Sequence, residues 1–358
     1  DTHVIIPTLI NGYTVTAIGR RVFYNCTAIT EVTIPSTVTD IGTQIFYKAS
    51  NLTTVNYNSA YCSSENPFLN LSHITKVTFG GSVVPANILN GYTNIIEIEI
   101  KDSVTRIGSY AFKNCSSLTS VAIGNSVTSI GDSAFLGCSS FTSVTIPDSV
   151  TGIGDSAFSG CSSLTSITIP DSVTSIGDSA FERCSSLTSI TIPDSVTSIG
   201  EYAFYNCALT SLTLPEGLSE IKQYSFYGCD FTKIDIPYGV VSIGNGAFAE
   251  CEFVEELVLP SSLESIGASA FYNVSKITYI ALPKSLKTIG DRAFNTNVAG
   301  GEARTIIMFN YVSKIGAYAF TTNSTINYKG STTEWGKIII DPRNYQYNVE
   351  TLNGSFVD

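Results

Sequence analysis

Apolar residues recur along the chain with a period of about 23 residues. One unit, residues 112–134, reads F-K-N-C-S-S-L-T-S-V-A-I-G-N-S-V-T-S-I-G-D-S-A, with apolar side chains mostly three positions apart. A single spacing of two, between Val121 and Ile123, predicts an extended strand. In the central copies Gly-Asp-Ser-Ala-Phe, which runs from the end of one unit into the next, predicts a short helical turn, with Asp132 and its equivalents capping its free N–H groups.

Each copy of the unit carries one large apolar anchor. Alignment of the copies gives fourteen such positions, thirteen of them Phe. They are Phe23, Phe46, Phe68, Leu89, Phe112, Phe135, Phe158, Phe181, Phe204, Phe226, Phe248, Phe271, Phe294 and Phe320. So short a unit cannot enclose a core, but stacked copies would bury each apolar residue against its own equivalent. We therefore predict a β-rich α/β solenoid, a curved right-handed stack with one parallel sheet on the concave side and short α- or 3₁₀-helical turns on the convex side.

The central copies resemble a known repeat. From Ile146 to Ile192 the unit reads, nearly unchanged, I-P-D-S-V-T-S-I-G-D-S-A-F-x-x-C-S-S-L-T-S-I-T. This unit resembles the BspA-like (Treponema pallidum type) leucine-rich repeat, and the resemblance covers about residues 4–330. It implies a leucine-rich-repeat solenoid in a secreted or surface protein that takes part in adhesion to matrix proteins, host cells or other microbes.

Two regions are expected along the chain. The solenoid, with about 14 repeats, spans residues 1–330, and a C-terminal capping segment spans 331–358. This last segment loses the period, and we interpret Trp335, Ile338 and Ile340 as covering the final core layer. An exposed N-terminal strand edge could pair two chains, although we expect a monomer.

Eight of the nine cysteines occupy one position of the repeat, three residues after the anchor. We predict a ladder of buried thiols, because parallel side chains in a stack point the same way and cannot bridge easily. No C-x-x-C is present and the only histidines are His3 and His73, which argues against a zinc site. Cys62 lies outside the shared position and is the thiol to test for reactivity. The predicted structural core includes Phe112, Phe135, Phe158, Phe181, Phe204, Cys115, Cys138, Cys161, Cys184 and Cys207.

Composition narrows the classes of function. The chain has 30 acidic and 19 basic residues, a net charge of −11, and no Lys/Arg-rich run, which argues against nucleic-acid and anionic-membrane partners. No apolar stretch is long enough for a membrane span. With only two histidines available as bases for its many serines, the chain is predicted to have no catalytic, cofactor or metal site.

Chemical variety on the predicted concave face is confined to its two ends, since the middle positions are Ser and Thr. Recognition normally needs varied or aromatic anchors. The candidate protein-binding residues are therefore Lys76, Glu97, Glu99, Lys233, Asp235, Glu256 and Tyr279. A second set lies on the outer side, where contact with protein or glycan and packing against the next turn are both open: Tyr24, Tyr47, Tyr205, Tyr227 and Tyr272.

Three functions remain open at this stage. The first is a non-enzymatic, secreted or cell-surface protein that binds an extracellular protein of a host or another microbe. The second is a glycan-binding module that uses the outer tyrosines. The third is a passive spacer, suggested by near-identical copies between residues 125 and 200.

Overall fold

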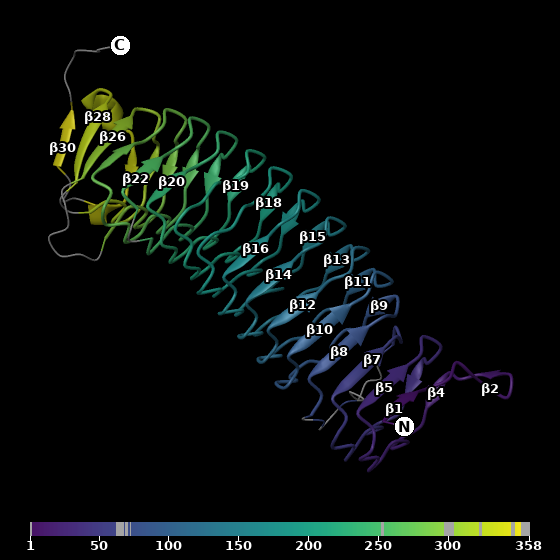
Figure 1. Ribbon diagram of the computed structural model, residues 1–358. Helices are drawn as coiled ribbons and strands as arrows, with labels where there is room; N and C mark the ends of the chain where they lie inside the picture. Colours follow the sequence, from purple (N-terminus) through teal and green to yellow (C-terminus); the bar gives the residue numbers. More distant parts are fainter. Residues whose placement is uncertain are drawn as a thin grey trace. The chain divides into compact units, whose positions relative to one another are not determined.

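The computed structural model describes residues 2–61, 68, 71, 73–251, 254–296, 304–321, 324–344 and 348–351. Cys62 and most of the last fourteen residues lie outside this range. The chain divides into two compact units, Asp1–Leu187 and Thr188–Asp358. In each unit the strands follow one another in chain order as rungs of parallel ladders, which confirms the predicted solenoid (Figure 1).

The first unit is built on an eight-stranded parallel sheet. In spatial order its strands are β1 (His3–Ile5), β5 (Glu31–Ile34), β7 (Thr54–Tyr57), β8 (Lys76–Phe79), β10 (Glu97–Ile100), β12 (Ser120–Ala122), β14 (Ser143–Thr145) and β16 (Ser166–Thr168). The register pairs Val121 with Val144 and Val144 with Ile167, and all three side chains are at most 7% exposed. Ser120, Ser143 and Ser166 alternate with them and are exposed, as the period of two predicts.

A second strand in each turn was not predicted. It covers two residues of V-T-S-I-G and forms a parallel ladder through β9 (Val83–Val84), β11 (Arg106–Ile107), β13 (Ser129–Ile130), β15 (Gly152–Ile153) and β17 (Ser175–Ile176). The first unit also contains the parallel pair β4 (Ala17–Ile18) and β6 (Asp40–Ile41), and an antiparallel hairpin of β2 (Leu9–Ile10) and β3 (Tyr13–Thr14). The prediction of a single sheet was therefore incomplete.

The third side of each turn consists of hydrogen-bonded turns rather than the predicted helical turn. Ser133 and Gly137 both have left-handed backbone, with φ of 54° and 71°. The N–H of Leu136 donates to the carbonyl of Ser133 at 3.2 Å, a bond across three residues. Two left-handed residues four positions apart stop the chain from continuing as a right-handed helix.

Backbone hydrogen bonds between turns differ in direction between the sides of the solenoid. On the strand side they run both ways: Thr119 N–H, in the later turn, donates to the Ile96 carbonyl at 3.1 Å, and Ile236 N–H, in the earlier turn, donates to the Val258 carbonyl at 3.3 Å. On the turn side the earlier one donates to the later one, as from Phe112 N–H to the Ala134 carbonyl at 2.9 Å. The backbone of each interior turn is therefore satisfied by both of its neighbours.

The Asp of Gly-Asp-Ser-Ala-Phe also bonds between turns, which corrects the predicted capping. Asp132 Oδ1 accepts from the N–H of Asp155 at 3.1 Å, and Asp155 Oδ1 accepts from the N–H of Asp178 at 2.9 Å. Each carboxylate therefore caps the equivalent residue of the next turn rather than its own turn. The turns themselves have no helix for it to cap.

The anchor phenylalanines form the core of the first unit. Phe158 is 0% exposed, and its ring stacks on Phe135 at 5.3 Å and on Phe181 at 5.5 Å, with an interplanar angle of 4° to each. At Leu89 the aromatic column is interrupted, and the buried rings of Tyr57 and Phe79 continue it beside the anchor position. Phe79 then packs on Phe112 at 5.6 Å.

The second unit repeats this plan. Its longer strands pair as β20 (Lys233–Asp235) with β22 (Glu256–Val258), and as the parallel sheet β24 (Tyr279–Ala281), β26 (Thr305–Phe309), β28 (Thr325–Lys329) and β30 (Asn348–Thr351). Its two-residue ladder runs through β19 (Glu220–Ile221), β21 (Ser242–Ile243), β23 (Ser265–Ile266), β25 (Thr288–Ile289), β27 (Lys314–Ile315) and β29 (Ile339–Ile340), and β18 covers Ser198–Ile199. From Phe204 to Phe320 consecutive anchors stack at 5.2 to 5.8 Å.

The segment after residue 330 adds to both ladders of the second unit. It contains the short helix α1 (Thr332–Trp335), closed by a capping box between Ser331 and Glu334, and the 3₁₀ turn η1 (Pro342–Asn344). The Trp335 ring packs edge-on against Tyr328 at 5.0 Å. β29 pairs with β27 and β30 pairs with β28, so this segment extends the stack although its sequence lacks the period. Its role as a cap stays a prediction.

Candidate functional site

Two clusters of charged residues lie on the outer faces of the long strands, one in each unit. In the first unit Lys76 on β8 and Glu97 on β10 occupy paired positions of the ladder, and Lys76 Nζ lies 2.7 Å from Glu97 Oε1. Glu99, two residues further along β10, contacts the ammonium of Lys101 and accepts from Thr78 Oγ1 at 3.3 Å. Lys76, Glu97 and Glu99 border a shallow concavity with Ser120 and Ala122. The structure thus brings these three predicted residues together.

The electrostatics of this first cluster are those of a solvent-exposed network. The hydrogen bond to Glu97 raises the pKa of Lys76, and the hydrogen bond from Lys101 lowers the pKa of Glu99. Both shifts favour the charged forms of Lys76 and Glu99. Lys101 was not among the predicted residues, because it follows the strand, where the alternation of inward and outward positions no longer applies.

The same face continues toward the N-terminus of the first unit as a network of side-chain hydrogen bonds. Asn56 Nδ2 donates to Glu31 Oε1 at 2.7 Å, and His3 Nε2 lies 3.1 Å from Thr33 Oγ1 and 3.6 Å from the Glu31 carboxylate. Glu31 on β5 and Asn56 on β7 were not among the predicted binding residues, and the network was not predicted. The rungs β12, β14 and β16 carry only small residues here.

In the second unit the predicted cluster is held by one lysine. Lys233 Nζ lies 3.2 Å from Asp235 Oδ2 on its own strand and 3.5 Å from Glu256 Oε1 on β22. The hydrogen bond to Asp235 raises the pKa of Lys233. Tyr279 on β24 is 58% exposed, so its ring is available for contact. The cluster itself combines two carboxylates and one cation; no ion pair or ring contact joins Tyr279 to it among the described residues.

The repeated cysteines have a role that their spacing alone did not indicate. The thiol of Cys161 donates to the carbonyl of Phe135, the anchor of the previous turn, at 3.3 Å. Burial raises the pKa of this thiol to about 12. Among the described cysteines none is joined in a disulfide, and all but the half-buried Cys26 are buried. These thiols serve packing and hydrogen bonding, since a neutral buried thiol is a poor nucleophile and a poor metal ligand.

A buried arginine in the second unit was also missed. Arg304 is 2% exposed, and its guanidinium donates to the carbonyls of Phe294, at 2.8 Å, and of Val274. Burial lowers its pKa to about 10. Since Val274 stands where other repeats have Cys, the arginine supplies hydrogen-bond donors near a position that lacks a thiol.

The outer tyrosines of the second unit pack mainly against one another. Tyr205 stacks on Tyr227 at 4.7 Å, and Tyr202 stacks on Tyr224 at 5.0 Å. Burial, followed by the charge of Glu250, raises the pKa of Tyr227. Tyr205 and Tyr227 therefore pack against the neighbouring turn, which was one of the two alternatives left open by the sequence. Stacking covers one face of each ring.

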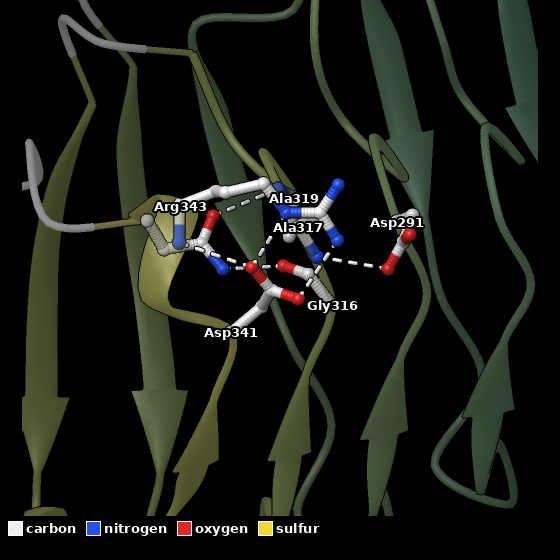
Figure 2. A network of polar contacts seen from close by, with 7 residues as sticks. Asp291, Gly316, Ala317, Ala319, Asp341 and Arg343 are labelled. Carbon is white, nitrogen blue, oxygen red and sulfur yellow. Dashed lines mark hydrogen bonds and ion pairs between the residues drawn. The ribbon is translucent and has the colours of Figure 1, made fainter.

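A polar network organises the C-terminal turns of the second unit (Figure 2). Asp341 accepts from Arg343 Nε at 2.8 Å and from Arg343 Nη2 at 2.9 Å, which lowers the pKa of the carboxyl to about 2. Asp291 Oδ1 accepts from the N–H of Ala317 at 2.8 Å, and Asn344 Oδ1 accepts from the N–H of Ala319 at 3.2 Å. These side chains satisfy backbone groups at the end of the turn ladder, a structural role.

The described residues contain no group of three or more His, Cys, Asp or Glu placed to hold a metal ion. Among the helices in the described part of the chain, none has the length and apolar character needed to cross a bilayer. The exposed faces instead offer paired charges, hydroxyls and single aromatic rings, which are suited to recognising another molecule at the surface.

Comparison with known proteins agrees with this organisation. A family model described as "BspA type Leucine rich repeat region (6 copies)" matches residues 5–87, 82–207 and 174–300. A leucine-rich repeat protein from Bacteroides ovatus ATCC 8483 is 23% identical, with 98% of this chain and 92% of that chain covered and a TM-score of 0.61. Comparison with curated proteins gives no match.

Two further solved structures are similar. The pneumococcal vaccine antigen PcpA is 22% identical, with 78% of this chain and 84% of that chain covered and a TM-score of 0.52. A leucine rich cell surface protein from Faecalibacterium prausnitzii A2-165 is 27% identical, with 95% and 91% covered and a TM-score of 0.45. The Bacteroides and pneumococcal proteins share the fold of this chain.

Proposed function

Because the chain belongs to the BspA-type leucine-rich repeat family, we propose that it is a non-enzymatic interaction protein, secreted or held at a cell surface, that binds an extracellular protein. The partner belongs to a host matrix, a host cell or another microbe, and binding is of the adhesion type. The observation that carries this proposal is the open face of the eight-stranded sheet in the first unit, where Lys76, Glu97 and Glu99 stand at fixed ladder positions. The family resemblance supports the location.

The geometry explains how such a face would recognise a partner. A parallel sheet holds outward residues about 4.8 Å apart between strands, so the charges are fixed before binding. Little side-chain entropy then has to be lost in the contact. The paired charges of Lys76 and Glu97 supply orientation and electrostatic complementarity rather than large affinity. In the second unit, the exposed ring of Tyr279 would serve as an anchor, and Glu256 and Lys233 would supply charges.

The test is a binding screen followed by a charge-swap variant. Full-length protein is screened by biolayer interferometry against matrix proteins and microbial surface proteins, and binding tighter than about 100 μM is expected for at least one. The double variant Lys76→Glu/Glu97→Lys keeps an ion pair but reverses its direction, and should weaken that binding. The matched control swaps Lys287 and Glu264, an equally close pair at 2.8 Å in the second unit. Equal effects of the two swaps would contradict the assigned face.

A passive spacer is the second candidate function. It is favoured by the small, uniform outer side chains of β12, β14 and β16. Deletion of residues 147–169, one complete copy, would leave the activity of a spacer unchanged. Loss of an established binding activity after this deletion would instead support the interaction function. We also propose that the chain is a monomer, which light scattering at several concentrations tests.

A further inference from the structure

The outer edge of the first two turns carries a pair of tyrosines flanked by two cations. Tyr24 stacks on Tyr47 with 5.9 Å between ring centroids. The guanidinium of Arg21 lies 5.8 Å from the first centroid and 6.0 Å from the second, and the ammonium of Lys48 lies 5.7 and 6.0 Å from the same two centroids. Two cations thus converge on one aromatic pair.

The distances also show which ring surface is open. Each cation is about equally far from the two centroids, so it lies beside the stack rather than on its outer end. Tyr24 is 44% exposed, and within the described residues no second ring stacks on its other face. An aromatic face therefore meets solvent with two positive charges close beside it.

These cations are not neutralised by the protein. In the described part of the chain no carboxylate lies within 4.0 Å of Arg21 or Lys48, and the hydrogen bond that Arg21 Nε donates goes to the neutral amide of Gln44 at 2.9 Å. Lys76 and Lys233, by contrast, both face carboxylates. The position that holds Asp in the central repeats holds Arg20 here, which adds a third exposed cation to this edge.

We propose that this edge, formed by Arg21, Tyr24, Tyr47 and Lys48, binds an acidic polysaccharide. The apolar C–H face of a pyranose ring lies against Tyr24, and a carboxylate or sulfate of the sugar accepts hydrogen bonds from Arg21 and Lys48. The cluster spans about one sugar ring, since all four cation-to-centroid distances are at most 6.0 Å. A protein partner would need roughly 800 Å² with an apolar centre, which this flat cluster does not supply.

The tyrosines of the second unit provide a contrast within the same chain. Tyr205 and Tyr227 stack more closely, at 4.7 Å, yet the charged side chain that acts on Tyr227 is the carboxylate of Glu250. A polyanion would be repelled there. The inference is independent of the proposed protein-binding face, which lies on the strand side of the turns, so either can fail without the other.

The experiment measures binding of three polysaccharides to the full-length protein by isothermal titration calorimetry. The probes are heparin, which is sulfated, polygalacturonate, which carries only carboxylates, and neutral dextran. We expect heparin, polygalacturonate or both to bind, dextran not to bind, and the affinity to fall between about 50 and about 300 mM NaCl. Binding of heparin alone means that the site recognises sulfate groups. Binding of both heparin and polygalacturonate means that it accepts sulfate and carboxylate groups.

Variants then locate the site. Arg21→Gln and Lys48→Gln should each weaken binding about tenfold, the effect of losing one charge-assisted hydrogen bond, and Tyr24→Leu should weaken it without changing the salt dependence. Lys113→Gln is the matched control, because Lys113 lies 5.3 Å from the single ring of Tyr110 without a second cation. Unchanged melting temperatures show that the variants are folded.

Three results would overturn the proposal: no binding of either acidic polysaccharide below about 1 mM, equal loss in the Lys113→Gln control, or equal affinity for poly-glutamate together with no effect of Tyr24→Leu. The last result would mean that the edge attracts any polyanion, including acidic proteins.

Discussion

Phe158→Ala removes a ring from the middle of the aromatic column in the first unit. The side chain is fully buried and loses two stacked neighbours, Phe135 and Phe181. Truncation of a buried Phe costs about 3 to 5 kcal/mol, and the two parallel contacts place this site near the upper end, at about 5 kcal/mol. Phe23→Ala is the matched control, because Phe23 is half-buried and stacks only on Phe46, at 5.3 Å. Its cost should be about 2 kcal/mol.

Urea unfolding followed by circular dichroism measures both variants against the parent chain. The midpoint should fall clearly further for Phe158→Ala than for Phe23→Ala. Amide hydrogen exchange adds a spatial readout, since the inter-turn bonds from Phe135 N–H to the Ala157 carbonyl and from Phe158 N–H to the Ala180 carbonyl flank the lost ring. Faster exchange should be confined to the adjacent turns. Equal midpoints for the two variants, or exchange that rises evenly through the first unit, would refute this reasoning.

Three further predictions concern thiols, surface charges and the C-terminal segment. At pH 8 a thiol reagent should modify half-buried Cys26 in the native protein and spare Cys161. Burial raises the pKa of the Cys161 thiol to about 12, above its value in the unfolded chain. The contribution of this thiol to stability should therefore be lost as the pH rises from about 9 to about 12, and the melting temperature should fall over that range. Reaction of Cys161 as fast as in urea would contradict this. Lys76→Met should leave the melting temperature nearly unchanged, because the ion pair is exposed; a clear shift in a thermal melt would give the pair a structural role. Removal of residues 331–358 should lower the melting temperature and the solubility by exposing the last rung, and unchanged melting would reject the cap.

The sequence predicted the features of the fold that repeat with the chain. The aromatic period identified the core column and the solenoid, because only stacking can bury one ring per short unit. The two-residue ladder through Ile130 and Ile153 was missed, since two residues are too few to show alternation. The detour of the column through Tyr57 and Phe79 could not be predicted either, because it depends on how neighbouring turns fill the space beside Leu89.

For the candidate binding residues, too, the sequence predicted their placement on the strands but not all of their contacts. Alternation along the strands placed Lys76, Glu97 and Glu99 on the outer face, and the ladder register brings them together. Their partners came from the structure, because Lys101 lies after the strand and reaches back to it. From the sequence, the Asp132 carboxylate was assigned to its own turn, because helix capping is a local rule. In the structure this carboxylate accepts a hydrogen bond from the N–H of Asp155, which lies 23 positions later.

The opposed hydrogen bonds between turns have an electrostatic consequence within each unit. On the strand sides the bonds run both ways, so the peptide dipoles there largely offset one another along the stack. An α-helix of comparable length, whose dipoles all align, concentrates partial charge at its two ends. Lengthening this array by whole repeats therefore adds little polarisation on the strand sides, where the potential that an approaching ion meets is set by side chains such as Lys76 and Glu97 rather than by the backbone.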